Sequence, residues 1–182
     1  VNPTMQYVIA EGGASVYAIH HALRQHGLML PNFGTYGPAV VIGAMINKGG
    51  IGYGMTRYGW IADMVLGLEV ILANGETIRL GSLANQGTAF GPFQKWIHLP
   101  DLLGMFTFPA GSMGIITKVC LRAIEGRREW LHDYCYGFRR DQLQSAQEAL
   151  MQLVRGEVVY DIHFTGRWQY QWPLEEGLYD KS

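Results

Sequence analysis

The chain has 182 residues, of which 48% are hydrophobic and 16% are charged, a composition typical of folded globular proteins and not of disordered ones. Fourteen basic and fifteen acidic residues leave a net charge of −1 without any block of like charge, which excludes nucleic acid and anionic membrane surfaces as expected partners. No apolar run is long enough to span a bilayer, and the first residues lack a signal-peptide pattern, so a cytoplasmic location is expected.

The first predicted elements are a strand and a helix. The apolar run Gln6–Ala10 predicts the strand, which ends at Gly12 and Gly13. Ser15 is suited to cap a helix from Val16 to about His26, and Gly27 is suited to end it in the left-handed conformation. The helix face expected to pack inward carries Val16, Ile19, Leu23 and His26.

Neither the histidines nor the cysteines have the spacing of metal ligands, and no metal site is expected. His20 and His21 are adjacent, whereas ligand pairs on a helix are three or four residues apart. They are interpreted as surface or partly buried side chains. Cys120 and Cys135 are interpreted as reduced core thiols.

Residues 37–59 form the stretch around which the chain is organised. It contains seven glycines, and Gly43 and Ala44 open a run expected to form one helical turn. Four further glycines then predict a loop with few side chains: Gly49, Gly50, Gly52 and Gly54. Such a backbone can approach a ligand closely, and its N–H groups can surround an anion such as a pyrophosphate. A tight structural bend is the alternative, and spacing alone does not separate the two.

Two common phosphate-binding motifs do not fit this stretch. The dinucleotide fingerprint needs a third glycine in register, but Gly54 is followed by Met55, Thr56 and Arg57. The P-loop needs Ser or Thr after its lysine, and Lys48 is followed by Gly49. Arg57 has two equally weighted interpretations, as a contact for a phosphate or carboxylate and as a member of a structural ion pair.

A hairpin is the clearest local signal. Val65–Ala73 and Glu76–Leu80 are apolar runs separated by Asn74 and Gly75, which suits a type I′ turn with positive φ at both residues. The following residues 82–100 are expected to form a loop. Within it, Trp96 and His98 are interpreted as packing residues in preference to substrate contacts.

A long strand is predicted from Ile115 to Ile124. Strict alternation would place one set of side chains on one face: Ile115, Thr117, Val119, Leu121 and Ala123. The polar junction that follows Glu125 predicts a domain boundary, with one domain over residues 1–125 and the beginning of another over residues 126–182. In the second part we expect a strand over Trp130–Phe138, a helix capped by Asp141, and a strand over Val158–Phe164. The remaining aromatic residues have no regular period and suit packing on a partner surface: Trp168, Tyr170 and Trp172.

Four segments in this order resemble one known family. They are EGGASVYAI, VVIGAMINKGGIGYGMTRYG, VLGLEVILANGETIRLG and LLGMFTFPAGSMGIITKVCLRAI. Their order and spacing are similar to those of the FAD-binding domain of the vanillyl-alcohol oxidase and p-cresol methylhydroxylase family, whose relatives include D-lactate dehydrogenases and glycolate oxidase subunits. The resemblance covers about two-thirds of the chain, from Gln6 to Ile124.

The resemblance implies an α+β fold, with an FAD-binding subdomain built on a mainly antiparallel sheet flanked by helices, followed by the start of an α+β substrate (cap) domain. It also implies FAD as the cofactor. The implied FAD contacts are Val41, Gly43, Ala44, Asn47, Gly49, Gly50, Ile51 and Ile116. A side chain at Gly43 or Gly50 is expected to impair FAD retention more than folding.

The resemblance implies that the FAD site is incomplete in these residues. The family carries a preceding subdomain with a separate pyrophosphate loop, and most substrate-domain residues lie beyond those present here. We therefore expect the N-terminal FAD subdomain and the rest of the cap domain to be supplied by another chain or by the same protein, with oligomer formation. No catalytic residue is assigned, because nucleophile elbows and paired carboxylates are absent and a flavin needs neither.

The leading functional hypothesis is part of an FAD-dependent oxidoreductase that transfers hydride from an alcohol, a 2-hydroxy acid or a phenolic small molecule to the flavin. Two alternatives remain open. The first is a flavin reductase of the UDP-N-acetylmuramate type, whose nicotinamide-driven chemistry runs in the opposite direction. The second is a non-catalytic fragment or scaffold subunit of a flavoprotein.

Overall fold

The computed structural model describes residues 1–34, 39–85, 87–88, 91–93, 95, 100–126 and 134–163. Several sequence predictions lie outside these residues. They concern Trp96, His98, the start of the strand expected at Trp130, and the aromatic residues Trp168, Tyr170 and Trp172.

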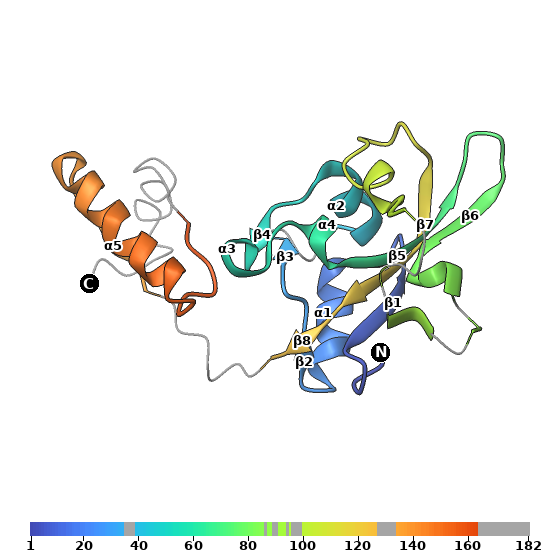
Figure 1. Ribbon diagram of the computed structural model, residues 1–182, viewed down its shortest axis with the longest axis horizontal. Helices are drawn as coiled ribbons and strands as arrows, with labels where there is room; N and C mark the ends of the chain where they lie inside the picture. Colours follow the sequence, from blue (N-terminus) through green and yellow to red (C-terminus); the bar gives the residue numbers. More distant parts are fainter. Residues whose placement is uncertain are drawn as a thin grey trace.

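The described residues form five α-helices and eight strands (Figure 1). The helices are α1 (Val16–Arg24), α2 (Ile42–Lys48), α3 (Met55–Tyr58), α4 (Ile61–Met64) and α5 (Leu143–Arg155). The strands are β1 (Tyr7–Glu11), β2 (Leu28–Met29), β3 (Phe33–Gly34), β4 (Gly52–Tyr53), β5 (Val65–Ile71), β6 (Thr77–Gly81), β7 (Ile115–Arg122) and β8 (Ile124–Glu125).

The main sheet is antiparallel throughout, with the strand order β1-β7-β5-β6. Two short antiparallel pairs, β2 with β8 and β3 with β4, form separate two-stranded sheets. The expected α+β fold with a mainly antiparallel sheet and flanking helices is confirmed.

A single apolar core joins the helices to the sheet. Helix α1 contributes Val16, Ile19 and Leu23, and α2 contributes Ile42, Met45 and Ile46, all at most 4% exposed. The sheet side of this core includes Val8, Leu68, Val70, Ile116, Val119 and Leu121. Because α2 belongs to the glycine-rich stretch and shares this core, the stretch is held against the sheet. The core residues of the described part of the chain all lie between Val8 and Ala123.

Helix α1 has the predicted ends. The Ser15 side chain accepts a hydrogen bond from the Ala18 amide at 3.1 Å, and Gly27 has φ +69°. The prediction that His26 faces the core is wrong. His26 follows the last helical residue, where the chain has left the helical path, and its side chain is exposed.

The hairpin is present, but its predicted turn type is wrong. Leu72 and Glu76 close a three-residue loop, because the Leu72 amide donates to the Glu76 carbonyl and the Gly75 amide donates to the Leu72 carbonyl. Only Gly75 has a positive φ, of +85°. The Asn74 side chain instead accepts a hydrogen bond from the Glu76 amide at 3.0 Å. This local hydrogen bond favours the longer loop.

Strand β7 does not alternate regularly as predicted. Its pairing with β5 shifts between Glu69, opposite Lys118, and Val70, opposite Ile116, which leaves Thr117 as an extra residue. The resulting bulge reverses the alternation, since Ile115 is 68% exposed and Ile116 only 7%. Ile116 therefore joins the core with Val119 and Leu121, and Ile115 does not.

The described residues after Gly126 contain the expected helix but neither expected strand. Residues 134–138 and 158–163 have no strand partner among the described residues, and residues 158–163 pack on α3 instead. An extended segment becomes a strand only when its backbone is paired. Helix α5, which lies apart from the sheet in Figure 1, begins after Gln142 and has no buried residue. Cys135 is exposed, so the prediction that both thiols are in the core holds only for Cys120.

None of the helices in the described part of the chain combines the length and the apolar character that a membrane crossing requires.

Candidate functional site

The N-terminus of α2 is docked on the backbone of residues 12–14. The Gly43 amide donates to the Gly12 carbonyl at 2.8 Å, and the Ile42 amide donates to the Ala14 carbonyl at 2.9 Å. Val41, the N-cap residue, pairs with Ser15. Two of the first-turn amides of α2 are therefore already bonded within the protein, whereas the Ala44 amide has no hydrogen bond within the described part of the chain.

Gly12 lies at the closest approach between α2 and the sheet. A Cβ atom at Gly12 would overlap the Ile116 carbonyl, and one at Gly43 would lie 2.9 Å from the Gly12 carbonyl oxygen. The Gly12 amide also donates to the Thr117 carbonyl at 2.8 Å. Gly43 and Ile116, two of the predicted FAD contacts, therefore both lie against the backbone of Gly12.

The C-terminal end of α2 forms a second close contact. Gly49 ends the helix in the left-handed conformation, and a Cβ there would overlap the Phe108 ring. A Cβ at Gly50 would overlap the Met45 side chain. The Asn47 carbonyl accepts from the Ala110 amide at 3.0 Å, and its side chain accepts from the Gly111 amide at 3.3 Å.

These contacts change the interpretation of the glycine substitutions. The space beside Gly43 and Gly50 is occupied by protein atoms, so a side chain at either position disturbs packing directly. Such a substitution is therefore expected to disturb folding as well, and the prediction that FAD retention suffers more than folding stays a prediction. The run opened by Gly43 and Ala44, expected to form one helical turn, belongs to the longer helix α2, and the predicted loop from Gly49 to Gly54 contains the left-handed cap of that helix and strand β4.

Three of the predicted FAD contacts are exposed: Val41, Ala44 and Ile51. Val41 and Ala44 are one turn apart on α2, and Ile51 is 51% exposed. Exposed aromatic residues follow on neighbouring segments, with the Trp60 and Phe108 rings 5.6 Å apart and edge to face. Phe108 is tied to α2 by its amide, which donates to the Ile46 carbonyl.

The sequence analysis did not identify Gly12 or Phe108 as residues of this region. The pair Gly12-Gly13 was interpreted only as the end of a strand. Its occurrence directly after β1 is the signal that could have indicated a close backbone approach. No comparable signal singles out Phe108.

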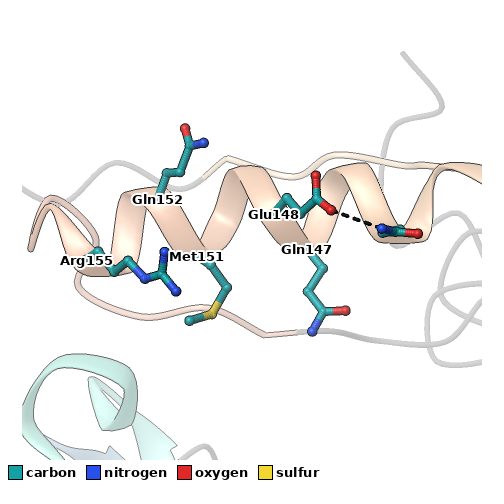
Figure 2. Close-up of a pocket in the computed structure, with 6 residues that line it drawn as sticks. Gln147, Glu148, Met151, Gln152 and Arg155 are labelled. Atoms are coloured by element: carbon teal, nitrogen blue, oxygen red, sulfur yellow. Dashed lines mark hydrogen bonds between the residues drawn. The ribbon is translucent and has the colours of Figure 1, made fainter.

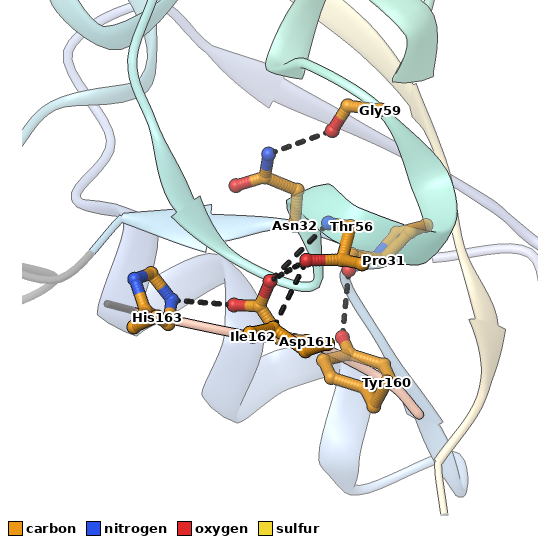
Figure 3. Close-up of polar contacts among 8 residues, drawn as sticks. All are labelled: Pro31, Asn32, Thr56, Gly59, Tyr160, Asp161, Ile162 and His163. Carbon is orange, nitrogen blue, oxygen red and sulfur yellow. Dashed lines mark hydrogen bonds and ion pairs between the residues drawn. The ribbon is translucent and has the colours of Figure 1, made fainter. Parts of the chain in front are cut away.

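Residues 157–163 dock beside the glycine-rich stretch (Figure 3). The Asp161 carboxylate accepts from the Thr56 amide at 3.2 Å and from the Thr56 hydroxyl at 2.7 Å, and the same hydroxyl accepts from the Ile162 amide at 3.0 Å. The Tyr160 hydroxyl donates to the Pro31 carbonyl at 2.6 Å, and burial raises the pKa of this hydroxyl. Arg57 donates to the Glu157 carbonyl and forms no ion pair among the described residues.

We expect Thr56→Val to loosen this docking, because the valine removes one donor and one acceptor from the contact with Asp161 and Ile162. The free energy of local opening should fall by about 1–2 kcal/mol. Faster hydrogen exchange at the Ile162 amide is the measurement. Thr77→Val is the matched control, since Thr77 is exposed on β6. Unchanged exchange at Ile162 in Thr56→Val would contradict the expectation.

A depression lies along α5 (Figure 2), and the described residues that line it all belong to that helix. The Gln144 side chain donates to Glu148 at 3.1 Å within it. Among its described lining residues, Glu148 is the one carboxylate, and they include no set that suits a metal ion. Across the described residues, no group of three or more His, Cys, Asp or Glu side chains suits a metal ion.

Comparison with known proteins agrees with this geometry. Residues 1–81 match the FAD binding domain family. The chain is 32% identical over 120 residues to the 4-cresol dehydrogenase [hydroxylating] flavoprotein subunit of Pseudomonas putida, covering 65% of this chain and 22% of that protein. It is 32% identical over 103 residues to glycolate oxidase subunit GlcD of Bacillus subtilis, covering 57% and 20% respectively.

The fold has solved counterparts. A crystal structure of 6-hydroxy-D-nicotine oxidase from Arthrobacter nicotinovorans superposes with a TM-score of 0.55 at 18% identity, covering 69% of this chain and 24% of that one.

The chain therefore carries an FAD-binding domain. The chain is similar in sequence to FAD-linked oxidases and dehydrogenases. It spans about a fifth of the length of the two relatives named above.

The described residues fit part of an FAD molecule. The exposed apolar and aromatic side chains around α2 suit a flat ring system. A diphosphate needs several N–H donors or cations, and in the first turn of α2 only the Ala44 amide lacks an acceptor among the described residues. These residues could therefore hold the ring-contacting side of the cofactor.

Proposed function

We propose that the chain is part of an FAD-dependent oxidoreductase that oxidises an alcohol, a 2-hydroxy acid or a phenolic substrate. The observation that carries the proposal is the match of residues 1–81 to the FAD binding domain, in the region where α2 and Gly12 pack on the sheet. The names of the two relatives, 4-cresol dehydrogenase and glycolate oxidase, support these substrate classes. When bound, oxidised FAD supplies a two-electron acceptor for such a substrate.

The proposed cofactor contacts are the exposed members of the predicted set, Val41, Ala44 and Ile51. The buried and partly buried members shape this surface through the backbone: Gly43, Asn47, Gly49, Gly50 and Ile116. The proposal includes a domain boundary after residue 125, supported by a core that lies wholly between Val8 and Ala123. The cytoplasmic location stays a prediction.

Further polypeptide completes the FAD site in this proposal, either from the same protein or from another chain. Two features support it. The first turn of α2 offers few free donors for a diphosphate among the described residues. Exposed apolar side chains also surround the helix, including Ile51, Trp60 and Phe108, and such surfaces are commonly covered by a ligand or partner.

The test compares two proteins. One is the 182-residue chain alone, and the other is a longer protein that contains this chain together with the rest of the FAD domain. We expect the larger protein to retain FAD after gel filtration and the shorter chain to retain little. Under anaerobic conditions, 4-cresol, glycolate or D-lactate should bleach the flavin. A larger protein that retains no FAD, or a flavin bleached by a nicotinamide but by none of these substrates, would overturn the proposal.

Val41→Asp tests the position of the site. An aspartate is favourable at a helix N-cap, so folding should be preserved. A charged carboxylate in place of an apolar side chain that contacts the ring system should weaken FAD binding about tenfold or more. Val158→Asp is the matched control, because Val158 is 69% exposed and lies outside the proposed contacts. Equal FAD affinity in the two variants would place the cofactor elsewhere.

A further inference from the structure

An imidazole and a carboxylate form a closely held pair beside the glycine-rich stretch. The Nε2 atom of His163 lies 2.6 Å from the Oδ2 atom of Asp161. The Asp161 side chain is 8% exposed and the His163 side chain is 36% exposed. The buried member of the pair is therefore the carboxylate, and the accessible member is the imidazole.

Asp161 is fixed by donors from α3. Its Oδ1 atom accepts from the amide and the hydroxyl of Thr56. Burial alone raises the pKa of this carboxyl, but the hydrogen bonds from Thr56, Gly54 and His163 together hold the pKa below its ordinary value. Asp161 is therefore an anion at neutral pH.

An ionised Asp161 fixes the tautomer of His163. A carboxylate can only accept, so Nε2 of the imidazole must donate to it, and a neutral ring then carries its lone pair on Nδ1. In Figure 3 the second ring nitrogen lies on the side of the imidazole that faces away from Asp161. The free lone pair is thus directed outward from the docked segment.

The imidazole lies next to the stretch that carries the proposed cofactor contacts. Its ring is edge to face with Tyr53 of β4, with centroids 5.2 Å apart, and Tyr53 is two residues from Ile51. The docking contacts of Thr56 and Tyr160 hold the segment in this place. The pair is therefore located by contacts to the FAD-binding domain itself.

We propose that His163 is the proton acceptor for the hydroxyl group of an alcohol or 2-hydroxy acid substrate, and that Asp161 is the residue that positions it. This inference rests on the proposed function. The substrate O–H bond breaks and an Nδ1–H bond forms on His163. The hydrogen and electron pair of the adjacent C–H bond go to oxidised FAD, the oxidant of the proposed reaction, so the substrate leaves as the carbonyl compound.

The pH dependence of this step is set by the groups around the ring. These are the Asp161 carboxylate on the same segment and the Tyr53 phenol from β4. Helix α3 adds Arg57, which donates to the Glu157 carbonyl and lies over the Tyr58 ring, and Tyr58 itself packs on Tyr160. Only a neutral imidazole can accept the substrate proton, so the rate of substrate oxidation should rise with pH.

The kinetic test uses the FAD-loaded protein that contains this chain. We expect His163→Gln to slow anaerobic flavin reduction by about 100-fold or more and to remove its rise with pH. Asp161→Asn should slow it less. Imidazole added to His163→Ala should restore part of the rate, which a purely structural role would not allow. His26→Gln is the control, because His26 is exposed beyond α1.

A second readout does not depend on activity. Nitrogen-15 NMR of the histidine side chains should show His163 protonated at Nε2 and bare at Nδ1 at neutral to alkaline pH. A ring protonated at Nδ1 instead would overturn the inference. So would an unchanged rate and pH profile in His163→Gln in a protein that holds FAD and oxidises substrate. Wild-type protein that holds no FAD would overturn the proposed function, whereas the tautomer measurement would still report on the pair.

Discussion

Gly12→Ala is expected to lower the free energy of unfolding by about 3 kcal/mol or more, whereas Gly13→Ala should leave it nearly unchanged. The added methyl group at Gly12 would overlap the Ile116 carbonyl, and that carbonyl belongs to the backbone of β7, which cannot rotate away. Either the end of β1 must leave β7 or α2 must lift from Gly12. Both movements break buried backbone hydrogen bonds, including those of Gly12 with Thr117 and Gly43.

Gly13→Ala is the matched control, because it makes the same chemical change at the next residue. A Cβ at Gly13 would meet no atom within 4 Å, and neither Gly12 nor Gly13 has a positive φ, so backbone strain does not distinguish the two variants. Thermal unfolding of the protein, followed by circular dichroism, is the measurement. Gly12→Ala should lower Tm by about 6–12 °C. Equal Tm values for the two variants would show that the contact between α2 and the sheet is more adaptable than its geometry indicates.

The parts of the fold that could be predicted from the sequence are those decided by local hydrogen bonds. Ser15 caps α1 through an oxygen three residues from its donor, and Gly27 adopts a conformation that glycine favours. Neither feature depends on distant residues. The existence of the β5–β6 hairpin was predictable for the same reason.

The features that escaped prediction depend on partners far along the chain. The bulge at Thr117 arises where β7 pairs with β5. The Thr117 hydroxyl donates to the Glu69 main-chain carbonyl and to the Glu69 carboxylate. A strictly alternating pattern does not take contacts with a neighbouring strand into account. The prediction of which sheet face carries Ile115 and which carries Ile116 is therefore wrong. The segment 158–163 was apolar enough to predict a strand, but its polar atoms found partners on α3 instead of a neighbouring strand.

The candidate site shows the same division. Glycine content correctly drew attention to residues 37–59, because a backbone without side chains permits close approach. What approaches Gly43, however, is Gly12 from an earlier turn of the chain, and what approaches Gly49 is Phe108 from a later one. A glycine pattern predicts a close contact with the backbone, but the contacting residue is identified only by the fold.

Glu69→Gln is the second prediction with a large expected effect, and it tests the electrostatics of the sheet. The Glu69 side chain is 10% exposed and lies between its two cross-strand neighbours. Its carboxylate contacts Arg79 at 2.8 Å and Lys118 at 3.3 Å, and accepts from Thr117 at 3.0 Å. The hydrogen bond from Arg79 is the main cause that lowers the pKa of this carboxyl, against the opposing effect of burial.

A pKa that is lower in the folded than in the unfolded protein means that ionised Glu69 stabilises the fold above the unfolded pKa of a glutamate, about 4.3. This contribution is lost as pH falls through the folded pKa. Because Arg79 and Lys118 are 54% and 44% exposed, solvent screens both pairs, and we expect Glu69→Gln to lower the free energy of unfolding by only about 1–2 kcal/mol at pH 7.

Urea unfolding of both proteins from pH 7 to pH 3 should show the difference shrinking below about pH 5. Glu125→Gln, at an exposed glutamate of β8, should show no such pH-dependent difference. A Glu69→Gln difference that stayed constant across this range would mean that side-chain packing, and not the charge on the carboxylate, accounts for the loss of stability.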